Sequence, residues 1–533
     1  MDNSGHVTRS YGRFFTKRLM IIFVCAFAGV AFAVEPTPET AAWWAHVRVL
    51  AADNMEGRDT GSAGYARAAK YVVNQFQMAN LKPAGTNGYY QSVPLHSVAL
   101  RTKDSTVEFD RSSATRLTWL QQITILPHAG LPEHLQAPLV FCGYALADAC
   151  SQTLPLDVKG KIVVFLNAFP PTVPAAQQVQ ARAQRAERLR KSGAVGAISI
   201  DDPTFTEPPR WPAAYARAVT VVDPDRPAGV RNDAFVDLRL RPEAADPLLA
   251  GSKHTFAELM RLRTSGASLP AFEIPGTLRL RLEFDTRDFT SDNVVALAPG
   301  SDPALGNQYL VVSAHLDGYG YGEPVNGDRI YNGALDDSAY VAELIEFARH
   351  LQDHPTRRPI LFAVFTGEEK GLLGSAFFTA HPPVPQDQLA ADINLDMLRP
   401  IFPLKILTCL AVDESSLGST VRAVGGSLGI EVRPDMEPER DMFHRADHFN
   451  FIRIGVPAVG FIFGYDHGTA AERVYRRWYA DRYHKPSDDV DQPIDFAAAA
   501  KFNVFFEKLA VTIANAENRP TWNPNSPYKP AVH

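Results

Sequence analysis

The stretch YLVVSAHLD (residues 309–317) places a short apolar run directly before a histidine and an aspartate. A run of this kind is typical of a strand that is covered on both faces. Two similar runs, at 360–365 and 393–395, each end one to four residues before another acidic cluster. Between the first two runs, apolar residues from Val341 to Leu351 recur at helical spacing. The pattern therefore predicts strand, helix, strand.

Further apolar runs at 404–412 and 456–463 extend this alternation. It predicts an α/β fold with a mostly parallel central sheet flanked by helices. In such sheets ligands bind beyond the carboxyl ends of the strands. The polar clusters that follow the strands are therefore expected to share one pocket.

Five clusters of metal-ligand type follow one another along the chain. They are His315-Leu316-Asp317, Asp336-Asp337, Glu368-Glu369, Asp396 and His484. A single acidic pair is more often a solvated turn or a helix cap, but five clusters in succession favour a metal site. Imidazole nitrogen and carboxylate oxygen are ligands that zinc prefers, and two histidines with three carboxylates suffice for two ions. The sequence therefore predicts a two-metal hydrolase.

The positions of these residues divide the tasks among them. Asp336 stands at the turn into a helix, between the His315 and Glu369 segments, and is the best candidate to bridge two ions. Hydrolysis also needs a general base that is not spent on metal, and adjacent Glu368 and Glu369 can divide these roles. Asp317, two residues after His315, is placed to orient the imidazole.

At these residues the chain resembles the zinc aminopeptidases of the M28 family, which carry co-catalytic zinc on an α/β sheet. The matching pieces are His315-x-Asp317, Gly333-Ala334-x-Asp336-Asp337, Thr366-Gly367-Glu368-Glu369, Asn394-Leu395-Asp396-Met397 and Tyr483-His484 with Asp488. The resemblance implies a peptidase that removes N-terminal residues from peptides, using a metal-bridged water.

The resemblance also implies a role for each residue. One zinc ion would bind His315 and Glu369, the other would bind Asp396 and His484, and Asp336 would bridge them. Glu368 would act as the base and Asp317 would orient the imidazole. Tyr483 would donate to the developing oxyanion.

The resemblance to the family extends to both sides of a β-rich stretch, residues 128–255. Met55 to Ser62 also fits the family, although Arg58 receives no catalytic task and is expected only to fix a loop by pairing with a carboxylate. The β-rich stretch 128–255 resembles a protease-associated (PA) domain, on DVKGKIVV (157–164) and KSGAVGAI (191–198). The predicted division is a signal peptide at 1–33, peptidase parts at 34–127 and 256–519, a PA-like insert at 128–255 and an irregular tail at 520–533.

The N-terminus predicts export to the periplasm or beyond the cell. Basic residues precede an apolar run from Leu19 to Phe32, and Ala31-Phe32-Ala33 is a small-x-small cleavage site. This run is short for a membrane span, so no stable anchor is expected after cleavage. The leader carries a net charge of +3, which leaves the remainder near −9 and makes nucleic acid an unlikely partner. Peptides are the expected partners, and the oligomeric state stays open.

Three cysteines follow the leader, of which Cys142 and Cys150 are close enough in sequence for a local disulfide. A rival motif, Gly-x-Ser-x-Gly at 425–429, lacks the preceding strand and following helix of a serine hydrolase. Asp447-His448 and His444 are kept off the ligand list.

Three alternatives share the predicted fold. A carboxypeptidase would need a basic group for a terminal carboxylate, for which Arg399 and Arg445 are candidates. A glutaminyl cyclase would use a single zinc ion. A non-catalytic binding protein would have lost metal ligands, whereas all five ligand positions are present here.

Overall fold

The computed structural model describes residues 36–111, 114–146, 156–174, 177–204, 217–223 and 232–530. Residues Pro36–His533 form one compact unit. The predicted signal peptide lies outside the described residues. Within the described part of the chain, no helix has the length and apolar character needed to cross a bilayer.

The larger of two main sheets has ten strands. Their order is β19 (Glu431–Arg433), β18 (Ile406–Leu410), β20 (Ala458–Gly464), β17 (Leu389–Asn394), β13 (Tyr309–His315), β16 (Ile360–Phe365), β12 (Phe284–Ala298), β2 (Tyr90–Leu100) and β9 (Arg217–Val221), with β1 (Lys82–Pro83) also paired to β12. The four central strands from β20 to β16 are parallel. The sheet is antiparallel from β16 outward through β12 to β9, and also between β18 and β20. The α/β fold is thus confirmed, with the parallel part at the centre and antiparallel strands beside it.

Both faces of this sheet are covered, which explains the uninterrupted apolar runs. Along β13, Leu310 and Val312 belong to one hydrophobic core, and Val311 belongs to the core on the opposite face. The first face is covered by α1 (Pro38–Leu50), α2 (Ala63–Met78), α6 (Ala339–Leu351), α8 (Leu417–Ser427), α10 (Ala470–Asp481) and α11 (Phe496–Asn515). The second face is covered by α7 (Leu373–Ala380) and α9 (His448–Arg453). A strand buried on both faces has no polar side to alternate with.

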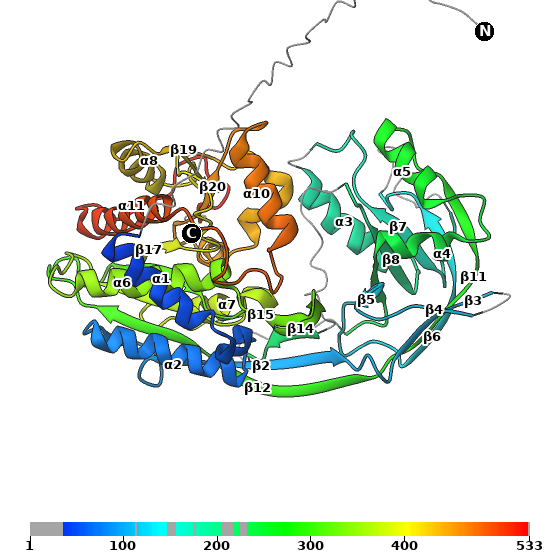
Figure 1. Ribbon diagram of the computed structural model, residues 1–533, viewed down its shortest axis with the longest axis horizontal. Helices are drawn as coiled ribbons and strands as arrows, with labels where there is room; N and C mark the ends of the chain where they lie inside the picture. Colours follow the sequence, from blue (N-terminus) through cyan, green and yellow to red (C-terminus); the bar gives the residue numbers. More distant parts are fainter. Residues whose placement is uncertain are drawn as a thin grey trace, which may run out of the picture. The chain divides into compact units, whose positions relative to one another are not determined.

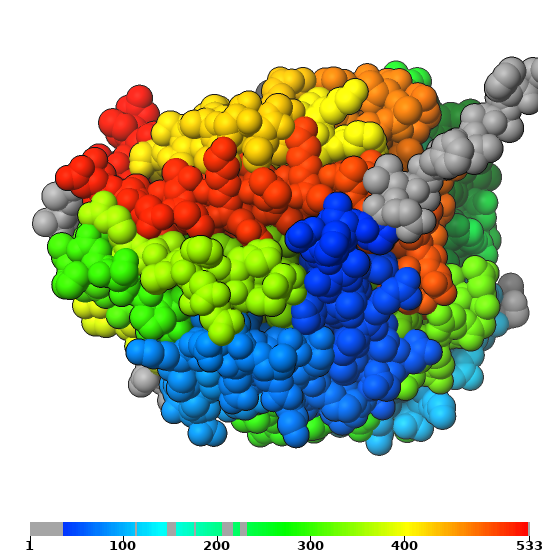
Figure 2. Space-filling view, turned by 60° about the vertical axis from the view of Figure 1, so that its left-hand side comes forward, coloured from blue at the N-terminus to red at the C-terminus, as the bar shows by residue number. Residues whose placement is uncertain are grey.

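The N-terminal helices pack onto the C-terminal part of the chain. The indole N–H of Trp43 donates to the carbonyl of Ala339 at 2.8 Å. The Trp44 ring meets Phe496 edge-on, with 6.0 Å between the ring centres. Figure 2 shows this segment, in blue, against the orange-red α11. Segments far apart in sequence thus form one core.

The second sheet has eight strands, and with the helices beside it we call residues 106–281 the inserted segment. Its strand order is β4 (Thr115–Arg116), β3 (Thr106–Asp110), β11 (Ala271–Arg281), β6 (His134–Cys142), β7 (Ile162–Asn167), β8 (Gly196–Asp201), β10 (Val236–Leu240) and β5 (Ile123–Ile125). The helices are α3 (Gln178–Lys191), α4 (Ala245–Leu249) and α5 (Phe256–Ser265).

The sheet extends beyond the predicted limits of 128 and 255 at both ends. β3 lies before residue 128 and β11 lies after residue 255, and the two strands pair with each other. The long strands β2 and β12 run side by side and lead the chain from the large sheet into the second sheet and back (Figure 1). Inside the predicted limits, β9 joins the large sheet instead. Composition marks a change of character along the chain, but it does not show which distant strands pair.

A two-stranded hairpin and the described tail lie outside the two main sheets. A hairpin of β14 (Gly320–Val325) and β15 (Asp328–Tyr331) follows the first metal-ligand cluster. Gly425 to Ser427 lie in the last turn of α8, so the Gly-x-Ser-x-Gly motif is not a strand-turn-helix elbow. The described tail has no helix or regular strand, but its Trp522 indole donates to the Gly455 carbonyl at 2.8 Å. Cys142 and Cys409 are buried free thiols, and Cys150 lies outside the described residues.

A carboxyl group without partners is buried on α6. Glu343 is 0% exposed, and neither of its carboxylate oxygens has a hydrogen-bond partner among the described residues. Burial raises its pKa well above the ordinary value, and the nearby Glu507 and Glu346 add to this. The folded protein therefore favours the protonated form of Glu343, whereas the unfolded chain ionises it at neutral pH.

Glu343→Gln is expected to raise the free energy of unfolding at pH 7 by about 1–3 kcal/mol. The wild type becomes less stable as the pH rises above the pKa of an unfolded glutamate, about 4.3, because the unfolded chain then loses the proton and the folded chain does not. Below that pH both states are protonated, so the difference should shrink. Urea unfolding at pH 7 and pH 4 checks this.

Glu346→Gln is the control on the same helix. Against the effect of burial, hydrogen bonds from His46 and Arg349 lower the pKa of Glu346, so its neutralisation should destabilise the protein at pH 7. A Glu343→Gln variant no more stable than wild type at pH 7 would contradict the prediction.

Candidate metal centre

Two groups of metal-ligand type meet beyond the carboxyl ends of the central strands. Nε2 of His315, at the end of β13, lies 3.2 Å from Oδ1 of Asp336 and 4.0 Å from Oδ1 of Asp396. Nε2 of His484 lies 3.1 Å from Oδ2 of Asp336 and 3.4 Å from Oε1 of Glu369. In each group the ligand atoms lie within 4.8 Å of one another. Asp336 offers one oxygen to each group and stands between them.

This grouping corrects the pairing that the family resemblance implied. His315 lies with Asp396 rather than with Glu369, and His484 lies with Glu369. β13 and β17 are parallel neighbours, so His315 and the segment containing Asp396 leave the sheet side by side. The 3₁₀ turn η5 (Glu368–Lys370), after β16, directs Glu369 to the other side of Asp336.

The donor set fits two divalent cations. Nε2 of His315 and Oδ2 of Asp336 are buried and have no hydrogen-bond partner in the described part of the chain, although another side chain of the group lies close to each. Burial raises the pKa of Asp396 to about 7 and raises that of Glu368 well above its ordinary value. Burial would lower the pKa of His315, but Glu368 and Asp336 hold it well above its ordinary value. The buried carboxylates thus lack enough positive charge, which metal ions would supply.

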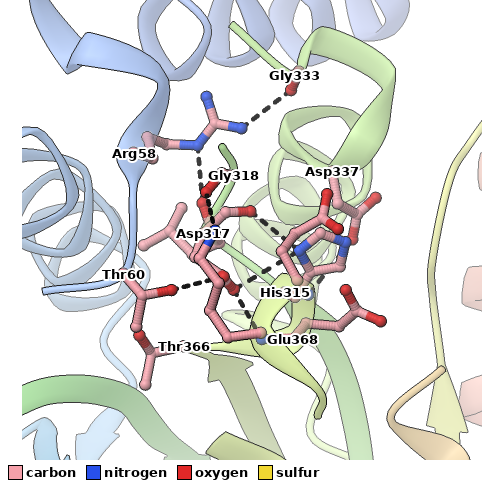
Figure 3. A network of polar contacts seen from close by, with 12 residues as sticks. Arg58, Thr60, His315, Asp317, Gly318, Gly333, Asp337, Thr366 and Glu368 are labelled. Atoms are coloured by element: carbon pink, nitrogen blue, oxygen red, sulfur yellow. Dashed lines mark hydrogen bonds and ion pairs between the residues drawn. The ribbon is translucent and has the colours of Figure 1, made fainter. Parts of the chain in front are cut away.

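Asp317 acts through two different groups. Its backbone carbonyl accepts a hydrogen bond from Nδ1 of His315 at 3.1 Å, which fixes the tautomer that leaves Nε2 for a metal. The carboxylate is 3.8 Å from that nitrogen, and it accepts instead from the Glu368 backbone N–H at 2.9 Å and from the Thr60 hydroxyl at 2.8 Å (Figure 3). The prediction that the side chain orients the imidazole is therefore corrected, because the carboxylate positions Glu368.

Arg58 ties the loops around the centre together. Its buried guanidinium donates to the carbonyls of Leu316 at 2.7 Å, Asn332 at 2.6 Å and Leu50 at 2.8 Å. It also donates to the carbonyl of Gly333 at 3.0 Å (Figure 3). These acceptors are carbonyls, not the carboxylate that the sequence led us to expect. Arg58 thus fixes the segments next to Asp317 and Asp336, and no local motif shows this.

Asp488 holds the backbone of Asp336, the residue that the two groups have in common. Its carboxylate accepts from the N–H groups of Leu335 and Asp336, both at 3.1 Å, and from the Gln492 amide at 2.8 Å. Burial raises its pKa to about 7 against these hydrogen bonds. Because Asp488 follows His484 by four residues, it connects two ligand segments.

Tyr483 lies on the ring of His484. The two rings stack with 3.6 Å between their centres, and the Tyr483 hydroxyl accepts a hydrogen bond from Nη2 of Arg445 at 2.9 Å. The Tyr319 hydroxyl contacts Nδ1 of His484 at 3.2 Å. The imidazole is thus held by aromatic rings as well as by its ligand contacts.

The residues kept off the ligand list lie outside both groups. The Asp447 carboxylate accepts from the Ser375 hydroxyl, and burial lowers the pKa of His448 to about 3, so that this imidazole is neutral. A third possible group, Glu437 with His467 and Glu472, is partly exposed, and Glu437 already pairs with Arg440 and Arg476.

The model of peptidase family M28 matches residues 293–509, which include every residue of both ligand groups. These residues, the M28 domain, belong to peptidase family M28.

Two curated relatives match part of the chain. A probable leucine aminopeptidase 2 from Aspergillus oryzae is 27% identical over 217 residues, covering 38% of this chain and 40% of the relative. A probable zinc metalloprotease from Pyrenophora teres f. teres is 34% identical over 105 residues, covering 20% of this chain and 22% of the relative. The match thus spans less than half the length of either relative.

Two solved structures share the fold over most of the chain. An aminopeptidase from Aneurinibacillus sp. strain AM-1 has a TM-score of 0.58 at 18% identity, covering 91% of this chain and 96% of that structure. A zinc aminopeptidase from Bacillus subtilis has a TM-score of 0.56 at 16% identity, with coverage of 91% and 97%. The fold around the M28 domain is therefore shared well beyond residues 293–509.

Asp488→Asn is expected to weaken metal binding by the M28 domain about 10- to 100-fold, because a group that orients a ligand from behind tunes metal affinity by this amount. Titration of the zinc-loaded protein with a competing chelator measures the change. Asp489→Asn is the matched control. Among the described contacts, the Asp489 carboxylate accepts a hydrogen bond only from the backbone N–H of Val490. Equal zinc affinity in both variants would remove Asp488 from this role.

Proposed function

We propose that the M28 domain is a two-zinc aminopeptidase. One ion would be held by His315 and Asp396, the other by His484 and Glu369, with Asp336 shared. The observation that carries the proposal is that two ligand groups share Asp336 while Glu368, beside them, belongs to neither. When bound, zinc would polarise the scissile carbonyl and lower the pKa of water.

Glu368 is the proposed general base. Its backbone is held by the Asp317 carboxylate, and its side chain lies close to His315 (Figure 3). In this role it takes a proton from the attacking water and returns it to the departing amine. A buried carboxylate that is not a ligand is suited to move a proton in this way.

Tyr483 is the proposed donor to the oxyanion that develops on the substrate. Arg445 donates to its hydroxyl, and a positive donor strengthens the hydrogen bond that the phenol itself can give. Tyr483→Phe is expected to lower kcat by roughly 10²- to 10³-fold with little loss of zinc. Steady-state kinetics with parallel metal analysis checks this, and an unchanged kcat would assign the ring to packing alone.

Aminopeptidase action is favoured over carboxypeptidase action. The carboxylates around Asp336 suit a cationic amino terminus electrostatically. Arg399, one candidate for binding a terminal carboxylate, is 0% exposed and packed against the faces of Tyr475 and Tyr479 at 4.6 and 4.8 Å. Arg445 already donates to Tyr483. Several similar proteins are also named aminopeptidases.

The substrates proposed are peptides with a free amino terminus, encountered outside the cytoplasm. The basic N-terminus, the apolar run and the small-x-small site support export. Hydrolysis of leucine p-nitroanilide, compared with its N-acetyl derivative, tests the proposal together with zinc analysis. Cleavage of the free amine alone with about two zinc ions per chain is expected. Preference for the blocked compound, or the binding of a single ion, would overturn it.

A further inference from the structure

A cavity of about 400 Å³ lies in the inserted segment, between α3 and the strands beside it. Four arginines, Arg182, Arg185, Arg217 and Arg239, line it together with Phe165 and Asp237. Much of the remaining wall is apolar. A pocket of this size takes a ligand of roughly the size of an amino acid or a dipeptide.

Two of these arginines have their charge matched by a carboxylate. Nε of Arg239 lies 2.7 Å from Oδ1 of Asp201. Nη1 of Arg217 lies 2.6 Å from Oδ2 of Asp59. Asp237, the acidic residue of the wall, lies 3.9 Å from Arg190 of α3. The opposite charges in and around the wall are thus largely used.

Arg182 and Arg185 have no such match. Within the described ranges, no carboxylate lies at ion-pair distance from either guanidinium. Arg185 is 3% exposed, donates to Oδ1 of Asn167 at 2.8 Å and lies on the face of Phe165 at 4.5 Å. Burial, together with the like charge of Arg182 one turn earlier on α3, lowers its pKa to about 9. A buried guanidinium next to a like charge costs free energy unless an anion compensates it.

We propose that this cavity binds a small organic carboxylate with an apolar body. The carboxylate would lie between Arg182 and Arg185, and the apolar body would contact Phe165 and the aliphatic wall. A planar guanidinium held on an aromatic face is preorganised for a carboxylate.

Arg217 connects the cavity to the metal centre. It lines the cavity, and its partner Asp59 is also 3.2 Å from Nζ of Lys370, the residue after the ligand Glu369. Nζ of Lys370 in turn lies 4.7 Å from the centre of the Tyr319 ring. The hydroxyl of Tyr319 contacts His484. An anion in the cavity would compete with Asp59 for Arg217. Binding itself is independent of the proposed function, whereas an effect on turnover rests on it.

Calorimetric titration of the zinc-loaded full chain with N-acetyl-leucine and hexanoate tests the site, with N-acetyl-leucinamide as the uncharged comparison. Both acids are expected to bind, and the amide to bind at least tenfold more weakly. Arg182→Met should weaken acid binding at least tenfold, and Ala186→Phe, which fills the cavity, should abolish it. Lys191→Met, at an exposed position of the same helix, should change nothing.

Three results would overturn the proposal. One is that neither acid binds at millimolar concentration, and another is that the amide binds as well as the acid. The third is that Arg182→Met and Ala186→Phe, folded as judged by thermal unfolding, both bind N-acetyl-leucine like the wild type. That result would place the carboxylate at the metal centre instead.

Kinetics with a short peptide distinguish the two sources of the carboxylate. If the site takes the substrate's own terminus, Arg182→Met should raise KM for the free acid but not for its C-terminal amide. If it takes a separate molecule, N-acetyl-leucine should alter kcat, and Arg182→Met should leave KM unchanged for both. A protein that hydrolyses no peptide would end the proposed function and leave the calorimetric result standing.

Discussion

Glu368→Gln is expected to lower kcat by roughly 10²- to 10⁴-fold while the zinc content and KM stay close to those of the wild type. The amide has the size of the carboxylate but cannot take a proton from water. Zinc should remain bound because Glu368 belongs to neither ligand group. Its backbone contact with Asp317 involves the main-chain N–H, which the substitution retains.

Two measurements on the same preparation separate the base from a ligand. Metal analysis after dialysis is expected to give equal zinc for wild type and Glu368→Gln, and stopped-time assays should show the fall in kcat. Glu369→Gln is the matched neighbour, since it lies 3.4 Å from His484 and should lose metal as well as activity. Full turnover by Glu368→Gln would remove Glu368 from the base role.

The central strands β13 and β16 and the helix between them, α6, could be predicted from sequence because their pattern has a local cause. β13 and β16 are buried on both faces, so each appears as an unbroken apolar run. The apolar residues of α6 recur at helical spacing, although every residue from Ala339 to Ala348 is buried. Polar residues at the ends of parallel strands then predict a shared site.

The grouping of the ligands could not be predicted in this way. It depends on which strands are neighbours and on how the η5 turn directs Glu369, and neither property has a local signal. Asp317 shows the same limit on a smaller scale. Its spacing from His315 indicates a contact, but the imidazole meets the carbonyl and the carboxylate meets Glu368.

Arg58 and Asp488 acquire their roles only in three dimensions. Arg58 binds four carbonyls, one of which is 275 positions away in the chain, and Asp488 binds main-chain N–H groups more than 150 positions before it. A main-chain partner leaves no mark on residue type. Residues of this kind are therefore found from the structure, even where the metal ligands themselves are evident from the sequence.

Asp336→Ala is expected to release both metal ions, the largest loss of metal among single substitutions. Each of its oxygens lies within about 3.2 Å of a different histidine, so no other residue can replace it for either group. Asp396→Ala and Glu369→Ala should each release one ion. Metal content after equilibrium dialysis against a weak chelator measures this, and one retained ion in Asp336→Ala would show that Asp336 is not shared.

Paired substitutions distinguish the grouping in the structure from the grouping that the resemblance implied. His315→Ala with Asp396→Ala removes two ligands of one group and should leave the ion at His484 and Glu369 in place. His315→Ala with Glu369→Ala removes one ligand from each group and should leave no tightly held ion. The implied pairing requires the reverse outcome, because there His315 and Glu369 hold the same ion. Since both double variants remove two ligands and retain Asp336, their difference reports only which side chains share a metal.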